Sequence, residues 1–518
     1  GAAAAGPGRT AGGHDGAGGG GATPGRATGP VPGVDAPAVG RSPGPAPGRP
    51  REAGAGEEPP GAGWRVLYQW AVTEPEVRPR ALAALRALAH ANRVEPLGRD
   101  LARLLYARRR DGGWVLAASV TRLESFAGCP FQHFAAHGLR LREREVHRLD
   151  APRLGQVYHA ALSLLARRLR ERGWDWAELD EGRLQALLEE ILAELKPRLA
   201  EELAAGSGYQ QHLLAVAGRT LKRAAERLVE HARRGAFRPL DVEVEFGPDP
   251  QARLRVPPLP LPGGERLALR GRIDRIDGAP GAGGRWWVRV VDYKSSQRDL
   301  RLDELYHGLA LQLAVYLLVA TRAGASLLPS GPAGGAVEPA ALLFIPVHDP
   351  YLDTPAPMDP EAAAQQRAKQ QLRASGWVVA DPEVLAAHDR DGRPETLIPV
   401  VLNQDGTPRR RVSRVLSRGQ LEALFAHVER RLVEMSDAVL AGRAEVAPYR
   451  MKDRSPCAHC AFRAVCQFDP RVPGNGYRWL PSLSPDEVWA RVDGREAAPN
   501  PGAAEPGARG STGNGAGR

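Results

Sequence analysis

The chain lacks several features whose absence narrows what it can be. No apolar run approaches the roughly 20 residues that cross a bilayer, because the longest, 309–320, is interrupted by Gln312. The N-terminus lacks the charged-then-apolar pattern of a secretory signal, so we expect a cytoplasmic protein. Lysine is scarce, with five residues among 70 basic ones, and this makes Lys294 conspicuous. The formal charge of +10 favours a polyanionic partner only weakly, since an arginine-rich codon bias explains the excess as well.

Large apolar residues are almost absent from residues 1–63 and from the tail at 496–518, where many of the 59 glycines and 46 prolines lie. Such segments cannot bury enough apolar surface to offset the entropy of ordering them, so both are expected to be disordered. Residues 64–116 are expected to be helical and to belong to a different domain. We place the main domain at 117–480 and a C-terminal extension at 481–518.

Apolar periodicity within the main domain alternates between the helical and the strand period. Ser119 precedes an apolar-periodic run and is a typical helix cap. A period of two predicts strands at 240–246, 267–276, 286–293 and 341–347. Helical spacing predicts helices at 154–172, 181–202, 210–234, 303–322 and 420–442. This order predicts an α/β fold with a mixed central sheet flanked by helices.

Two acidic residues and a lysine stand out on the predicted strands. Asp292 and Lys294 are two residues apart, so they share one strand face, with Tyr293 on the other. Asp274 is expected to end the preceding strand. The glycine-rich connection at 278–284 would fold the two strands into a hairpin and bring Asp274 close to Asp292.

Paired carboxylates at such a point are suited to Mg²⁺, which prefers one or two carboxylates, waters and substrate phosphate oxygens. The ion would activate water and neutralise charge at a scissile phosphate, and the lysine would orient that water or stabilise developing charge. The alternative is a solvated ion pair between Asp292 and Lys294, worth about 0–1 kcal/mol. The apolar flanks at 286–291 argue against it, because they indicate a buried strand, where isolated charge is costly.

Four further residues are candidates for the same site. Glu243, on the strand before Asp274, would add a carboxylate, with Glu245 as its competitor on the same face. His159, on a predicted helix, would ligate the metal, although a lone histidine there is as well explained by packing. Gln312 and Tyr316 share one helix face and would contact DNA or hold Lys294, unless they simply pack.

The four cysteines form a second candidate site. Cys457, Cys460 and Cys466 have the spacing C-x₂-C-x₅-C, and Cys129 stands far upstream. In a cytosolic chain such a cluster indicates a metal rather than disulfides, and four thiolates suit Zn²⁺ or a [4Fe–4S] cluster. The x₅ spacing is unusual for zinc. A metal here would join the two ends of the main domain and stabilise the fold.

The order of these motifs resembles one family, the C-terminal PD-(D/E)xK nuclease domain of the B subunit of the AddAB-type helicase–nuclease. The resemblance covers residues 119–480. The segments that carry it are 119–134 (SVTRLESFAGCPFQHF), 155–159, 271–277, 292–295, 312–316 and 457–469 (CAHCAFRAVCQFD).

The resemblance implies a RecB-like nuclease fold and a [4Fe–4S] cluster on all four cysteines. It implies Mg²⁺ at His159, Asp274 and Asp292, with Glu243 and Lys294 also catalytic and Gln312 and Tyr316 in support. It further implies exonuclease cleavage of the strand whose 5′ end lies at a double-strand break. The helicase–nuclease A subunit would be the partner in a heterodimer that processes such breaks for recombinational repair.

The chain departs from this family at its front. The B subunit normally has a long helicase-like N-terminal region, of which residues 64–116 would be the last piece. No Gly-Lys dipeptide occurs anywhere, so there is no nucleotide-binding loop, and we do not expect this chain to bind ATP. Two other functions stay open: a non-catalytic DNA-binding scaffold, and a CRISPR-associated exonuclease of the same superfamily.

Overall fold

The computed structural model describes residues 62–88, 96–144, 151–202, 208–296, 298–329, 335–347, 357–363, 366, 373–472 and 475–494. The segments expected to be disordered lie outside these ranges, apart from residues 62 and 63, so their disorder stays a prediction. The chain divides into two compact units after Leu88. The described part of the first unit consists of helices α1 (Ala62–Thr73) and α2 (Arg78–Leu88). Among the described helices, none has both the length and the apolar character needed to cross a membrane.

The second unit is built on a mixed seven-stranded sheet, as the sequence predicted. Its strand order is β11-β10-β9-β8-β7-β3-β4. The pairs β3–β7, β7–β8 and β9–β10 are antiparallel, whereas β8–β9, β10–β11 and β3–β4 are parallel. The strands are β3 (Arg238–Gly247), β4 (Leu254–Arg255), β7 (Gly271–Pro280), β8 (Trp286–Lys294), β9 (Val337–Pro346), β10 (Ser375–Val379) and β11 (Val415–Leu416).

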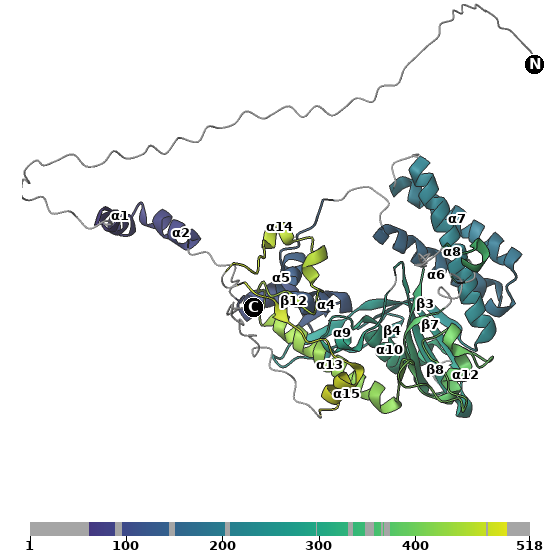
Figure 1. The fold of residues 1–518 in the computed structure, drawn as a ribbon. Coiled ribbons are helices and arrows are strands. Elements are labelled where there is room, and N and C mark those ends of the chain that lie inside the picture. The colour runs from purple at the N-terminus through teal and green to yellow at the C-terminus, as the bar shows by residue number, and fades with distance from the viewer. Residues whose placement is uncertain are drawn as a thin grey trace, which may run out of the picture. The chain divides into compact units, whose positions relative to one another are not determined.

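Helices cover both faces of this sheet, and alternate residues of β8 feed the two cores. Val288 and Val290 pack with α10, whereas Val291 and Tyr293 pack with the helical layer on the other face. That layer comprises α6 (Ala151–Arg172), α7 (Glu181–Glu202) and α8 (Gly208–Arg234), which cluster together in Figure 1. The opposite layer includes α4 (Val120–Gly128), α9 (Leu302–Tyr306), α10 (Gln312–Ala323) and α13 (Arg418–Leu440).

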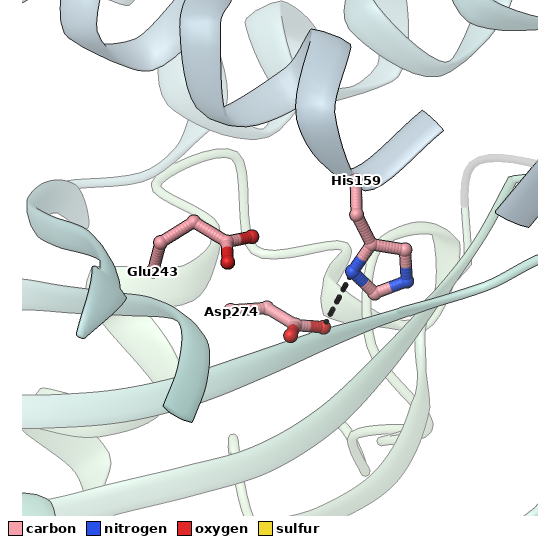
Figure 2. Close-up of side chains that lie close together, drawn as sticks. All are labelled: His159, Glu243 and Asp274. Carbon is pink, nitrogen blue, oxygen red and sulfur yellow. Dashed lines mark ion pairs between the residues drawn. The ribbon is translucent and has the colours of Figure 1, made fainter. Parts of the chain in front are cut away.

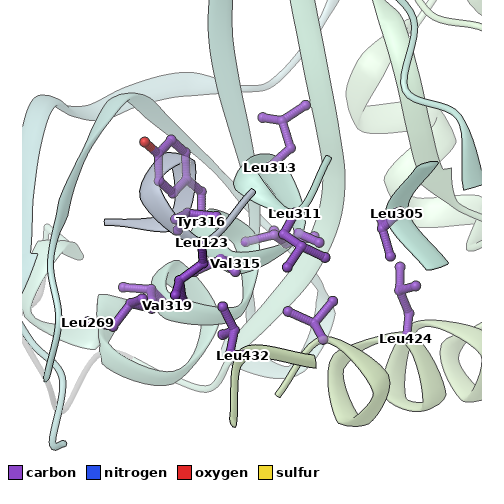
Figure 3. Packing of buried hydrophobic residues seen from close by; sticks show 14 of the residues in the cluster. Leu123, Leu269, Leu305, Leu311, Leu313, Val315, Tyr316, Val319, Leu424 and Leu432 are labelled. Carbon is purple, nitrogen blue, oxygen red and sulfur yellow. The ribbon is translucent and has the colours of Figure 1, made fainter. Parts of the chain in front are cut away.

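The core around α10 is the most apolar part of the domain. Residues 313–320 of this helix are all buried, because strands cover one side of it and α4 and α13 cover the other (Figure 3). This core extends past both expected boundaries of the nuclease domain. Tyr106 at the end of α3 (Arg99–Tyr106) and Trp489 in α15 (Pro485–Val492) are buried in it.

A second, four-stranded sheet corrects two predictions. Its order is β1-β2-β6-β5, with β1 (Ala107–Arg110), β2 (Gly113–Ala118), β5 (Leu259–Pro260) and β6 (Arg266–Leu269). Residues 107–118 are therefore a hairpin and not helical. The single strand expected at 267–276 is two strands in different sheets. The chain changes sheets at Arg270. Its amide donates to the carbonyl of Ala118 at the end of the β2–β6 ladder, and the following residues pair with β3 in the other sheet.

The helix expected at 303–322 is also divided, into α9 and α10. Gly308 interrupts it with a left-handed φ of 81°, a conformation that glycine adopts without strain. The break gives α10 its own N-terminus at Gln312, and this end of the helix reaches the candidate site.

Candidate active site

The acidic residues converge because three neighbouring strands place them in one row. The β3–β7 register sets Glu243 opposite Asp274. The β7–β8 register, which pairs Arg275 with Val291, brings Asp292 next to Asp274. Asp274 lies well inside β7 and not at the strand end as expected, because the ladder continues beyond it on both sides. The predicted hairpin is confirmed, and it delivers the predicted convergence.

At this row, the side chains of β3 change the face of the sheet toward which they point. Val242 packs in the core of α6–α8, whereas Val244 packs in the core of α10. Residues two apart normally share a face, and the exception arises at Glu243, whose φ is +52°. This conformation costs a non-glycine residue roughly 1–3 kcal/mol and is typical of functional sites. As a result the row is reached from both helical layers, by His159 from α6 and Gln312 from α10.

His159 extends from α6 toward the carboxylates (Figure 2). Its Nδ1 lies 3.2 Å from Asp274 Oδ2, and its Nε2 lies 2.9 Å from the carbonyl oxygen of Tyr293. One ligand atom from each of His159, Glu243 and Asp274 lies within 4.8 Å of the other two. Imidazole and carboxylate donors at this spacing are able to hold one divalent ion.

Asp292 stands beside this group and not within it. Lys294 Nζ lies 2.5 Å from Asp292 Oδ2, and Gln312 Nε2 donates to Asp292 Oδ1 at 3.0 Å and to Tyr316 Oη at 3.1 Å. Asp292 therefore lies between Lys294 and Gln312, and its role as a metal ligand with His159 and Asp274 stays a prediction. The predicted strand faces are correct, since Lys294 meets Asp292 while Tyr293 packs in the opposite core.

The electrostatics of the site favour a cation. Burial and the neighbouring Asp274 carboxylate raise the pKa of Asp292 to about 6. The same two causes raise the pKa of Glu243. Burial opposes the charged form of His159, but the contact with Asp274 outweighs it and the pKa of His159 is raised. Carboxylates that repel one another in a partly dry site are stabilised when a metal ion supplies positive charge.

Glu124 is a functional candidate that the sequence reasoning missed. It lies on α4 and its Oε1 accepts hydrogen bonds from the backbone amides of Leu311 (2.6 Å) and Gln312 (2.9 Å). Its carboxylate thus caps the N-terminus of α10, where a negative charge is favoured, and burial raises its pKa. The cap fixes the backbone of Gln312, whose side chain holds Asp292. The sequence placed Glu124 on the helix predicted after Ser119. Its contact with α10 could not be predicted, because the helix expected at 303–322 was assumed to be continuous.

The four cysteines line one pocket of 370 Å³. Cys129 directly follows α4, and the other three lie in the segment 457–466. None of these thiols belongs to a group of three donor atoms within 4.8 Å of one another among the described residues. Thiolates on one tetrahedral zinc ion lie about 3.8 Å apart at the usual Zn–S distance, so the pocket is wider than a single-zinc site. Burial raises the pKa of the Cys129 thiol to about 11.

Comparisons with known proteins agree with this architecture. A profile of the PD-(D/E)XK nuclease superfamily matches residues 117–467. A protein of Symbiobacterium thermophilum, named as the B subunit of an ATP-dependent helicase/deoxyribonuclease, is 42% identical over 435 residues, covering 83% of this chain and 36% of that protein. Proteins with the same name from Moorella thermoacetica and Pelotomaculum thermopropionicum are 40% and 38% identical, again over 36% of their length. The chain thus spans little more than a third of these relatives.

Proposed function

The chain belongs to the PD-(D/E)XK nuclease superfamily, and we propose that it cuts DNA with Mg²⁺ bound at His159, Glu243, Asp274 and Asp292. The observation that carries this proposal is the compact donor set of His159, Glu243 and Asp274 beside the buried Asp292–Lys294 pair. The similarity to proteins named deoxyribonuclease supports DNA as the substrate.

The chemistry follows from the residues in place. A bound Mg²⁺ would polarise water and offset charge on the scissile phosphate. His159 has acceptors at both ring nitrogens, so as a ligand through Nδ1 it would give up the proton there and would keep the Nε2–H for the Tyr293 carbonyl. Lys294 supplies positive charge next to Asp292, where the attacking water or the phosphate oxygens would lie. Gln312 holds Asp292 in place through its side-chain amide.

The test compares two glutamates on the same strand. Glu243→Ala removes a proposed ligand, whereas Glu245→Ala removes an exposed carboxylate two residues away. With purified protein and linear DNA, we expect Mg²⁺-dependent cleavage that chelation abolishes, that Glu243→Ala lowers strongly and that Glu245→Ala leaves unchanged. DNA binding without cleavage by the folded wild type would instead support a scaffold role.

We extend the proposal to a two-subunit machine. The relatives are named as the B subunit of a helicase/deoxyribonuclease. By this similarity the chain would act in the cytoplasm with a helicase-bearing A subunit at double-strand ends, cutting the strand that ends 5′ during recombinational repair. Co-purification with that partner, followed by digestion of end-labelled duplexes, tests both the association and the polarity. Failure to associate would remove the partner but not the nuclease.

We also propose that the four cysteines hold a [4Fe–4S] cluster. The thiols surround one pocket and are spread more widely than a single zinc ion requires. Anaerobic protein is expected to be brown and to contain about four irons per chain, one cluster on four thiolates. Colourless protein with one zinc would contradict the cluster.

A further inference from the structure

Five arginines lie between the metal site and the open edge of the small sheet. Arg272 stands on β7, two residues before Asp274, and Arg270 joins β6 to β7. Arg266 begins β6, and Arg108 and Arg110 belong to the edge strand β1. We call these five residues the arginine strip.

The strip is continuous in space. Arg272 Nε lies 3.0 Å from Glu243 Oε2, so one end touches the candidate metal site. Arg270 Nη2 lies 3.2 Å from Asp249, and Arg110 Nη1 lies 3.8 Å from the same carboxylate. Asp249 therefore joins Arg110 to Arg270, and Glu243 joins Arg272 to the candidate metal site.

At the end of the strip away from the metal site, strand register brings Arg108 and Arg266 together. Arg266 Nη2 donates to the carbonyl of Arg110 at 3.2 Å. The β1–β2 and β2–β6 registers put Arg108, Val115 and Arg266 in one row across the sheet. The adjacent row, which includes Leu116, packs in the core, so Arg108 and Arg266 lie on the opposite face, where Arg108 is exposed and Val115 between them is buried.

The strip has more positive charge than its acidic neighbours balance. Asp249 is shared by Arg110 and Arg270, Glu243 belongs to the metal site, and Glu245 lies opposite Arg272 in the β3–β7 register, so three acidic residues face five arginines. Arg108 makes no ion pair with any residue that the structure describes. The side chains of Arg110, Arg270 and Arg272 are 55%, 42% and 60% exposed, so their guanidinium groups are open to a ligand.

Protection of a sheet edge explains only part of this pattern. Charged residues on an edge strand prevent unwanted pairing, and this accounts for Arg108 and Arg110 on β1. It does not account for Arg266, because β6 lies between β2 and β5, nor for Arg272, because β7 lies between β8 and β3. Arg266, Arg270 and Arg272 therefore lie on the path to the metal site and not on the sheet edge.

Resting on the proposed nuclease function, we propose that the arginine strip binds the phosphates of the single DNA strand that enters the active site. The eight residue steps from Arg266 to Asp274 span up to roughly 26 Å at the rise of a strand. That length holds a segment of several nucleotides. Guanidinium groups suit phosphate oxygens because they donate in a planar fork, and positive charge that follows the backbone is typical of sequence-independent strand binding.

The chain offers a matched control of equal charge. Arg409, Arg410 and Arg411 are three consecutive exposed arginines at the rim of a separate groove of 2130 Å³. That groove is also lined by Asp299, Asp303, Asp486 and Asp493, so acidic groups offset its positive charge. Converting either arginine triplet to glutamine removes the same formal charge and leaves the proposed metal ligands intact.

The experiment measures the affinity for a fluorescent single-stranded oligonucleotide as a function of salt, with Ca²⁺ present to prevent cleavage. Each phosphate contact contributes about 0.7 to the slope of log affinity against log salt for single strands. The variant R108Q/R110Q/R266Q is expected to lower this slope by about 2 and to weaken binding at least tenfold at moderate salt. The variant R409Q/R410Q/R411Q is expected to keep the wild-type slope.

Cleavage of a small phosphodiester, bis-p-nitrophenyl phosphate, separates the strip from the chemistry. We expect this rate to be unchanged in the strip variant. Two outcomes would overturn the role of the strip in DNA binding. One is an equal salt dependence of DNA affinity in wild type and R108Q/R110Q/R266Q, and the other is an equal loss of affinity in R409Q/R410Q/R411Q. Loss of association with the helicase partner while DNA affinity stays intact would also overturn this role, in favour of a protein interface.

Two readouts keep the strip and the nuclease independent. Wild-type protein that binds the oligonucleotide with the expected slope but never cuts DNA would overturn the nuclease and leave the strip standing. If the triple variant is unstable, Arg108→Glu serves alone, because this residue has no ion pair to lose among the described residues, and a halved affinity or less is expected.

Discussion

We propose a metal at both the carboxylate site and the cysteine pocket, yet the protein assembles the two sites in opposite ways. The carboxylates are brought together by strand register, and burial together with the neighbouring Asp274 raises the pKa of Glu243 and of Asp292. The thiols surround an open pocket, and the raised pKa of Cys129 keeps at least that one neutral near pH 7. A cation therefore relieves existing repulsion at the first site, whereas at the second it adds a cross-link.

This contrast also predicts different consequences of losing metal. The strands that hold the carboxylates are buried in two cores, so we expect them to persist without an ion. The cysteine pocket joins Cys129 to the segment at 457–466, so an empty pocket removes a constraint between distant parts of the chain. On the proposed function, metal at the carboxylate site would serve chemistry, and metal at the cysteine pocket would serve stability.

The largest expected effect is on stability, at Cys129. Cys129→Ser should lower the free energy of unfolding by about 3–5 kcal/mol, the scale of a long-range cross-link. Thermal unfolding of the loaded protein measures this. In chelated protein the same substitution should change little, and an equal loss with and without metal would show that Cys129 only packs.

Lys294→Ala should have the next largest effect, and on the rate rather than the fold. Removing the positive charge beside Asp292 should lower DNA cleavage by about a hundredfold to a thousandfold, the usual cost of losing one group that stabilises a transition state. The melting temperature should stay close to that of the wild type, because Lys294 lies at the end of β8 and is partly exposed. Cleavage at the wild-type rate would show that Lys294 is only an ion-pair partner.

The pH dependence of metal binding should report on Asp292. Its pKa of about 6 lies above the ordinary value of 3.8, so in metal-free protein its contribution to stability is complete below pH 3.8 and is lost as the pH rises through 6. A cation reverses this penalty only where Asp292 is ionised. The stabilisation by Mg²⁺ should therefore grow between pH 5 and 7, on the order of 2 kcal/mol.

The control for this prediction is Asp292→Asn, in which the growth with pH should largely vanish. Asp274, Lys294 and His159 face the same carboxylate and titrate or carry charge. His159 contributes in the same direction, because its raised pKa means that a proton competes with the metal at acidic pH. Identical pH profiles in wild type and variant would assign the effect to His159.

Glu124→Gln should have the smallest effect. The amide keeps an acceptor for the α10 backbone but removes the negative charge at the helix N-terminus, which is worth about 1 kcal/mol. We expect cleavage to fall by up to about tenfold because Gln312 would hold Asp292 less firmly. Gln312→Ala should lower activity similarly, and the double variant should lose little more than either single one. Additive losses would show that the two residues act separately.

Local patterns in the sequence predicted most of the regular elements. The helix at Glu181–Glu202 and the strands around Asp274 and Asp292 follow from periodicities that one segment displays by itself. The errors fall where a distant partner intervenes. Residues 107–118 form strands because they pair with one another and with β6, and α10 begins at Gln312 because Glu124 caps it.

The sequence by itself determined the mixed α/β fold, the hairpin that carries Asp274 and Asp292, and the shared face of Asp292 and Lys294. Each of these depends on a period of two or 3.6 residues, which the chain displays locally. Only the tertiary structure decided that His159 contacts Asp274 from one face of the sheet while Gln312 holds Asp292 from the other. That choice arises from a backbone reversal at Glu243 and from two helices on opposite faces, and neither leaves a periodic trace in the sequence.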